Sequence, residues 1–173
     1  MDYLRDLLAV DSKQALEFFF EKLKEAVVSG NISESETLYV ASILAHYART
    51  SQCDAVDMPP PGNLSDIFST FALPMFVSQE VQCRNDPKIL ELTGSQTLFL
   101  VGFFRDQMEG KHNLDWYDRL GQSCFYRAGQ YFREQKRAML LKQVAGHFSI
   151  WAISCRNMSR NFRKNSSLFR LGS

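Results

Sequence analysis

The chain has 173 residues and a mass of 19.9 kDa, with 45% hydrophobic and 23% charged residues. This length suits one domain with a buried core, and the composition argues against disorder or an array of linkers. The formal net charge of +1, averaged over the whole chain, gives no support for a nucleic-acid or acidic-membrane partner. We therefore expect a single domain over residues 1–173.

Residues 1–10 are interrupted by three charged side chains, so they lack the unbroken apolar run of a secretory signal. The longest apolar run, 144–155, is too short to cross a bilayer as a helix. No C-x-x-C pair is formed by the four cysteines, Cys53, Cys83, Cys124 and Cys155. Their wide spacing favours reduced thiols, and we expect a cytoplasmic protein without a transmembrane segment.

Helices are predicted on both sides of one long loop in the first half. Apolar residues at helical spacing predict a helix over 11–29, with Gly30 as its C-terminal cap. Ser33 and Glu36 form a capping box, which predicts a second helix that would pair antiparallel with the first. Residues 50–62 (TSQCDAVDMPPPG) contain three consecutive prolines and predict an extended loop.

The next helices are marked by prolines and glycines. A helix from residue 63 should stop or kink near Pro74, and Asp86-Pro87 is typical of an N-cap followed by the first helical position. We expect that helix to break at Gly94 and to resume over 95–109, before Gly110 ends it.

The last part of the chain contains no proline, which permits long helices. Asn113 or Asp115 should cap a helix over 116–134, and a final helix is predicted over 135–161. Residues 165–173 are expected to form a flexible basic tail. No strand alternation of useful length occurs, so the predicted fold is an all-α, single-domain bundle of six to eight helices.

Two segments of the second half carry a resemblance. Residues 94–104 (GSQTLFLVGFF) and 114–126 (LDWYDRLGQSCFY) resemble an uncharacterised bacterial all-helical protein family, whose pattern is L-F-x-x-G-F-F followed by D-x-Y-Y-x-x-M-G. The chain departs from that pattern at Ser95, Leu114, Trp116 and Leu120. The resemblance implies an all-helical fold and brings no activity with it.

Glycines and acids in these segments have simple structural explanations. Gly102 and Gly121 lie inside predicted helices, where glycine costs about 1 kcal/mol, and close helix crossing is the usual compensation. Asp115 and Asp118 lie near a helix start, where the helix dipole favours negative charge. The alternative is a polar cluster of both with His112, which would bind a cation or perform acid–base chemistry if another element supplied partners.

No motif assigns a catalytic, cofactor-binding or metal-binding residue. The sequence has no phosphate-binding glycine loop, no nucleophile elbow and no H-E-x-x-H zinc motif. Glu109 and His112 have the spacing of a di-metal E-x-x-H pair, but Gly110 separates them and no second pair occurs.

The aromatic runs 18–20 and 103–104 favour helices covered on two sides, with a dimer face or an apolar ligand pocket as alternatives.

Charge is polarised along the sequence. Residues 1–135 carry 12 Lys and Arg against 19 Asp and Glu, whereas 136–173 carry eight Lys and Arg and no acid. On the predicted final helix, apolar residues share one arc and basic residues an adjacent one. The cations either pair with the acidic part of the chain or bind an anionic partner. The residues of that hypothetical partner surface are Lys142, Arg156, Arg160, Arg163, Lys164, Phe169 and Arg170.

Three functions remain open on these grounds. The first is a non-enzymatic interaction or regulatory module, whose basic C-terminal helix binds a protein, a nucleic acid, an acidic lipid or a second copy of the chain. The second is a helical binder of an apolar small molecule, which predicts an internal apolar cavity of several hundred cubic ångströms. The third is an enzyme with a polar site near His112, Asp115 and Asp118.

Overall fold

The structure of the chain, a computed structural model, describes residues 12–27, 31–53 and 85–170. Within these ranges it contains several packed helices and no strand, which confirms the predicted all-α class. The seven helices are α2 (Ser12–Ala26), α3 (Glu34–Cys53), α5 (Pro87–Phe103), α6 (Arg105–Met108), α7 (Leu114–Tyr131), α8 (Gln135–Gly146) and α9 (Phe148–Arg170). None of these helices is long and apolar enough to span a bilayer.

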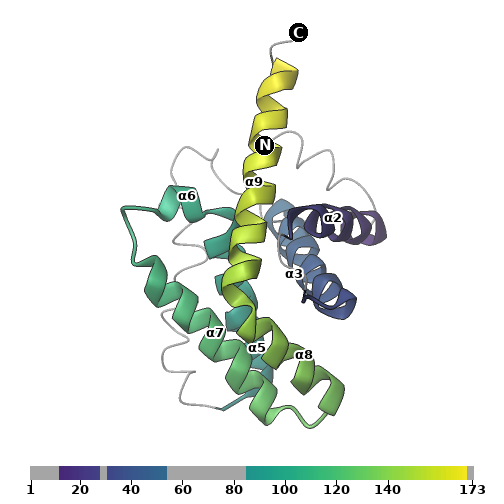
Figure 1. Cartoon of the computed structure of the whole chain (residues 1–173), viewed down its shortest axis with the longest axis vertical. Coiled ribbons are helices and arrows are strands. Elements are labelled where there is room, and N and C mark those ends of the chain that lie inside the picture. The colour runs from purple at the N-terminus through teal and green to yellow at the C-terminus, as the bar shows by residue number, and fades with distance from the viewer. Residues whose placement is uncertain (1–11, 28–30, 54–84, 171–173) are drawn as a thin grey trace.

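Helix α5 is the central element of the described fold, because α7 and α9 both pack along it. Figure 1 shows α7 on one side of α9, and the pair α2 and α3 on the other. Most of α5 from Leu90 onward is buried, including three polar residues. The hydroxyls of Thr93, Ser95 and Thr97 each donate to the carbonyl four residues earlier, so their burial leaves no hydroxyl without a partner.

Three predicted helix starts are confirmed by their capping hydrogen bonds. Ser33 Oγ accepts from the backbone N–H of Glu36 at the start of α3. Asp86 accepts from the N–H of Lys88 at the start of α5. Asn113 caps α7, since its side chain accepts from the N–H of Trp116. Each side chain satisfies a donor that the first turn of a helix leaves unpaired.

The predicted break at Gly94 is wrong, because α5 runs without interruption from Pro87 to Phe103. A Cβ at Gly94 would lie 3.1 Å from the ring of Phe125, so the absent side chain makes room for an aromatic ring of α7. The helix ends at Phe103 rather than at Glu109, and the short α6 follows. Gly110, at a φ of +79°, adopts the left-handed conformation that ends this segment.

The single helix predicted over 135–161 is divided into α8 and α9 at His147. This residue adopts φ −103° and ψ 14°, and its backbone N–H donates to Gln143. The predicted apolar stripe nevertheless continues across the break. Its described members are all buried: Leu141, Val144, Phe148, Trp151, Cys155 and Met158.

Helix extends into both segments that were predicted to be irregular. Helix α3 continues to Cys53, because residues 50–53 contain neither proline nor glycine, and residues 54–62 of the predicted loop lie outside the described residues. The predicted helix from residue 63 lies outside them as well. Helix α9 extends to Arg170, so helix replaces most of the tail predicted over 165–173.

Close helix crossings confirm the prediction made for two glycines. A Cβ added at Gly102 would lie 2.5 Å from Cβ of Cys155, where α5 crosses α9. A Cβ added at Gly121 would lie 2.5 Å from Cε2 of Phe148, which is buried between α7 and α9. Glycine therefore allows these helices to approach more closely than alanine would.

Candidate functional site

A pocket of about 630 Å³ opens at the surface between α3, α5 and the start of α8. Its lining residues are Tyr39, Ser42, Ile43, His46 and Tyr47 of α3, Lys88, Glu91, Leu92 and Ser95 of α5, and Phe132 and Arg137 near α8. The volume falls within the range of about 300–1,000 Å³ that is usual for ligand sites. It differs from the predicted internal apolar cavity, because it is open and its lining is mixed.

Helical periodicity explains why these residues face one another. Tyr39, Ile43 and Tyr47 are spaced four residues apart and so form one stripe along α3. On α5 the lining residues from Lys88 to Ser95 are spaced three or four positions apart, so they share one face and form the opposite wall. The two helices meet where the ring of Tyr47 stacks on Phe99, with centroids 5.2 Å apart.

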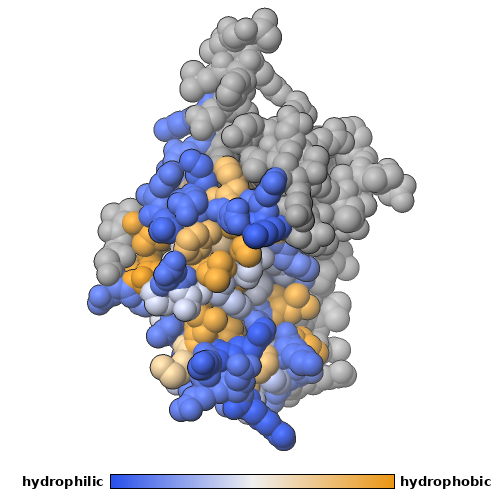
Figure 2. All heavy atoms as spheres, turned by 90° about the vertical axis from the view of Figure 1, so that its right-hand side faces the viewer, coloured by the Kyte–Doolittle hydropathy of each residue, from blue (hydrophilic) through white to orange (hydrophobic). Residues whose placement is uncertain are grey.

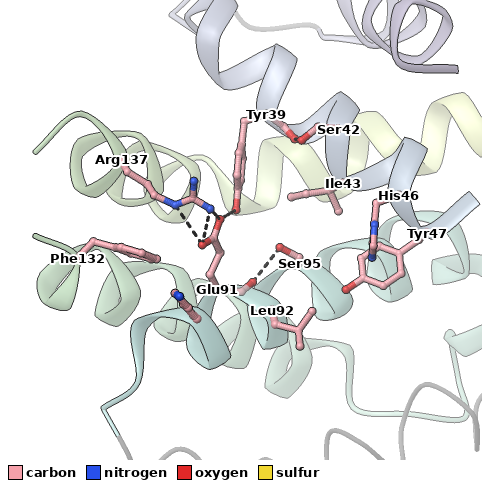
Figure 3. Close-up of a pocket in the computed structure, with 11 residues that line it drawn as sticks. Tyr39, Ser42, Ile43, His46, Tyr47, Glu91, Leu92, Ser95, Phe132 and Arg137 are labelled. Carbon is pink, nitrogen blue, oxygen red and sulfur yellow. Dashed lines mark hydrogen bonds and ion pairs between the residues drawn. The ribbon is translucent and has the colours of Figure 1, made fainter. Parts of the chain in front are cut away.

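The polar end of the pocket is a network centred on Glu91, whose side chain is only 12% exposed. Tyr39 donates its hydroxyl hydrogen to Oε1 at 2.8 Å, and Arg137 donates through Nη2 at 2.7 Å and through Nε at 3.3 Å (Figure 3). The guanidinium also lies over the ring of Phe132, 5.1 Å from its centroid. Charge-assisted and cation–π contacts thus fix Arg137 at the pocket.

Burial is the largest cause that raises the pKa of Tyr39 well above its ordinary value, with the neighbouring Glu91 carboxylate adding to it. The hydrogen bond from Arg137 to Glu91 likewise raises the pKa of the Arg137 guanidinium. At neutral pH the phenol is therefore protonated and the guanidinium charged. Both remain donors, and the carboxylate is their shared acceptor.

Away from this network, Ile43 and Leu92 form an apolar region of the pocket. Ile43 is nearly buried at 6% exposure and Leu92 is 49% exposed, whereas the partly buried Phe132 lies beside Arg137. Figure 3 shows Leu92 and Ile43 on opposite walls, away from the network around Glu91. The pocket therefore combines one charged end with an apolar wall, which is the combination that ligand sites commonly show.

Comparison with protein-family models, curated proteins and solved structures gives no match for this chain. The resemblance to a bacterial helical family therefore stays a prediction, and no relative supplies a function. The function has to be inferred from the chain's own residues.

Glu36 forms a second polar cluster, with a role that the capping box did not predict. Its side chain is 1% exposed, and Oε1 accepts from Nε1 of Trp151 at 2.7 Å and lies 2.8 Å from Nδ1 of His147. Ser33 caps α3 as expected, but the Glu36 carboxylate binds the α8–α9 junction instead of turning back on its own helix. This contact ties the start of α3 to the bend at His147.

Two arginines of the predicted partner surface bind acids within the chain. Arg156 Nε and Arg160 Nε each donate to Asp106 of α6 at 2.7 Å, and Arg156 also contacts Glu109 at 3.3 Å. They join α9 to α6, which is the intramolecular pairing considered as the alternative to partner binding. Lys142 is exposed on α8 and Lys164 on α9. The side chains of Arg163, Phe169 and Arg170 lie outside the described part.

The ion cluster at Asp106 predicts a specific loss of stability in acid. Hydrogen bonds from Arg160 and Arg156 lower the pKa of this carboxyl from 3.8 to about 2. Because the folded-state value is lowered, the stabilisation is complete above about pH 4 and is lost as the pH falls towards 2. In urea unfolding, the free energy of unfolding of Asp106→Asn should be lower than that of wild type at neutral pH. The two values should approach each other near pH 2.

The control is Arg133→Gln, which changes an exposed residue between α7 and α8 and should keep the wild-type pH profile. A difference in stability between Asp106→Asn and wild type that persists at pH 2 would contradict this assignment.

Of the polar cluster considered as an alternative to capping near α7, Asp118 is engaged in an ion pair. Asp118 binds Arg105 through both oxygens, at 3.1 and 3.0 Å, and so joins α7 to α6. Asp115 is exposed in the first turn of α7, and His112 is exposed just before it. Within the described ranges, no three His, Cys, Asp or Glu side chains gather as a metal site requires.

The described cysteines are buried thiols. Burial raises the pKa of Cys124 to about 11 and that of Cys155 to about 12, so both are protonated at neutral pH. A thiolate nucleophile at either position is therefore disfavoured. The side chain of Cys53 and all of Cys83 lie outside the described residues.

Sequence reasoning did not single out Tyr39, Glu91 or Arg137. One signal was available, since Glu91 is the only acid within the predominantly apolar helix α5. A lone carboxylate in such a helix usually needs a partner. Its partners come from α3 and α8, which local sequence patterns do not bring together.

Proposed function

We propose that this protein is a non-enzymatic helical binding module, and that the pocket between α3, α5 and α8 takes a small molecule with an apolar body. The observation that carries the proposal is the pocket itself, about 630 Å³ in volume, with an apolar wall and one charged end. It favours the small-molecule binder over the basic-helix module, because Arg156 and Arg160 already bind Asp106.

Binding accounts for the pocket better than catalysis does. The carboxylate of Glu91 already accepts hydrogen bonds from Tyr39 and Arg137, so it is a poor candidate for a general base. The raised pKa of Tyr39 keeps its hydroxyl a donor. These groups hold one another in place, as the supporting residues of a binding site do.

Filling the pocket should abolish binding of a neutral apolar probe. Leu92→Trp places a larger side chain on the pocket wall at a position that is already 49% exposed, so the core is not disturbed. Titration with N-phenyl-1-naphthylamine, followed by the probe's fluorescence, should show at least about tenfold weaker binding than wild type, because the ligand volume is occupied.

The matched control is Leu38→Trp. Leu38 is 47% exposed on α3 but does not line the pocket, so this variant should bind the probe as wild type does. Equal binding by both variants would place the apolar site elsewhere. Absence of binding by the wild-type protein would remove the proposal.

A second candidate is capture of an anionic partner by α9. It is supported by the last turns of α9, which extend beyond the other described helices in Figure 1, and by exposed Lys164. This function predicts that a polyanion such as heparin binds Leu92→Trp and wild type alike.

Association of two copies is a related proposal, since Figure 2 shows hydrophobic residues at the surface between hydrophilic ones. The cytoplasm is the proposed compartment, on the grounds of the cysteine spacing.

A further inference from the structure

We propose that the pocket is selective for aliphatic carboxylates, with Arg137 binding the carboxylate and the apolar wall binding the chain. The inference rests on the proposed function and adds the class of ligand. It follows from which hydrogen-bonding groups of the pocket are already used and which are left for a ligand.

Arg137 has donors that the protein does not use. Its Nε and Nη2 are directed at Glu91, and within the described part of the chain Nη1 donates no hydrogen bond. Figure 3 shows that third nitrogen pointing away from Glu91. A guanidinium carries five N–H donors, so the two on Nη1 remain for an oxyanion. The side chain is 46% exposed and lines the pocket, which makes these donors accessible.

The remaining charges of the pocket also favour an anion. Among the described residues that line the pocket, Glu91 is the only carboxylate, and Tyr39 and Arg137 already bind it. Lys88, one turn before Glu91 on the same helix, is exposed and adds a second positive charge. A cationic ligand would therefore meet two like charges and a carboxylate that is already paired.

The apolar wall explains why the ligand needs a chain as well as a carboxylate. Ile43, Leu92 and Phe132 give the pocket an apolar surface that a small inorganic anion would leave uncovered. Since burial of CH₂ groups is favourable, an aliphatic chain gains from this surface while the carboxylate stays at Arg137. Arg137 thus corresponds to the carboxylate of an aliphatic acid, and the wall of Ile43 and Leu92 to its chain.

The test compares three ligands of equal chain length: octanoate, 1-octanol and octylammonium. Binding is measured by NMR titration of the full chain, with backbone signals of α3 and α5 as the site reporter. We expect octanoate to bind at least about tenfold more tightly than octanol, because charge-assisted hydrogen bonds are stronger than neutral ones, and octylammonium to bind most weakly.

Arg137→Gln should remove the preference, so that octanoate and octanol bind equally, while Arg133→Gln should preserve it. Chemical shifts of the free proteins show whether the fold of each variant is intact. If Arg137→Gln perturbs the fold, the ligand class is judged from the relative affinities of the three ligands for the wild-type protein. Equal or tighter binding of octanol or octylammonium to wild type would overturn the ligand class and leave the proposed function standing.

Sedimentation with phosphatidylglycerol vesicles separates a free acid from a lipid head group. The free-acid assignment predicts octanoate binding without sedimentation, and vesicle binding without octanoate binding would overturn it. If neither the three ligands nor N-phenyl-1-naphthylamine binds, the proposed function itself fails. If only the naphthylamine binds, the carboxylate inference alone is overturned.

Discussion

Trp151→Ala is expected to lower the free energy of unfolding by about 3–5 kcal/mol, the usual loss when a buried aromatic side chain is truncated. Trp151 is 0% exposed and lies in the stripe of α9 that closes the core. Its removal leaves a cavity and takes one donor from the buried Glu36 carboxylate. Domains of this size are stable by about 5–15 kcal/mol, so this variant should lie close to the limit of folding.

Urea unfolding followed by circular dichroism measures this loss. The matched control is Ile153→Ala, two residues away on the same helix and 51% exposed, which should change stability much less. Trp151→Phe keeps an aromatic ring but not the indole N–H, and should fall between the two. Similar losses for Trp151→Ala and Ile153→Ala would contradict the burial of this face of α9 in the core.

Alanine should have opposite effects at two helical glycines. At Gly121 the new methyl group would meet the ring of buried Phe148, and overpacking of this kind costs about 1–3 kcal/mol. A Cβ added at Gly146, the last residue of α8, would have no atom of another described residue within 4 Å, apart from its own helix and chain neighbours, so alanine should stabilise the helix by up to about 1 kcal/mol.

Thermal or urea unfolding of the two variants tests the sign of each change rather than only its size. A stabilised Gly121→Ala protein would mean that α7 and α9 are further apart than the contact at Phe148 requires. A destabilised Gly146→Ala protein would mean that the end of α8 needs glycine for its backbone conformation.

The parts of the fold that could be predicted from sequence depend on neighbouring residues. Asp86 and Asn113 were recognisable as caps because the N–H that each accepts from lies two or three residues away. The stripe of α9 was recognisable from its spacing of three and four residues. Such signals report which face of a helix is buried, and not which helix covers it.

The pocket and the α8–α9 bend depend on distant residues instead. Glu91 meets Tyr39 across 52 positions and Arg137 across 46, and Glu36 meets His147 across 111. From its sequence neighbours alone, Glu36 is assigned to a capping box. Its observed partners, His147 and Trp151, are distant in sequence and are brought near only by the fold. The break expected at Gly94 failed for the same reason, since the ring of Phe125 that occupies the space belongs to another helix.

The order of synthesis matters for this fold, because α9 is made after the helices that it covers. Phe148, Trp151 and Met158 all enter the core from α9, which packs on both α5 and α2. During synthesis, the apolar faces of α2 and α5 that α9 covers therefore remain exposed until α9 has left the ribosome. Domains generally fold as units, and transiently exposed apolar surface promotes aggregation. Nascent chains that stop before Met158 should accordingly bind chaperones more strongly than chains in which α9 has emerged.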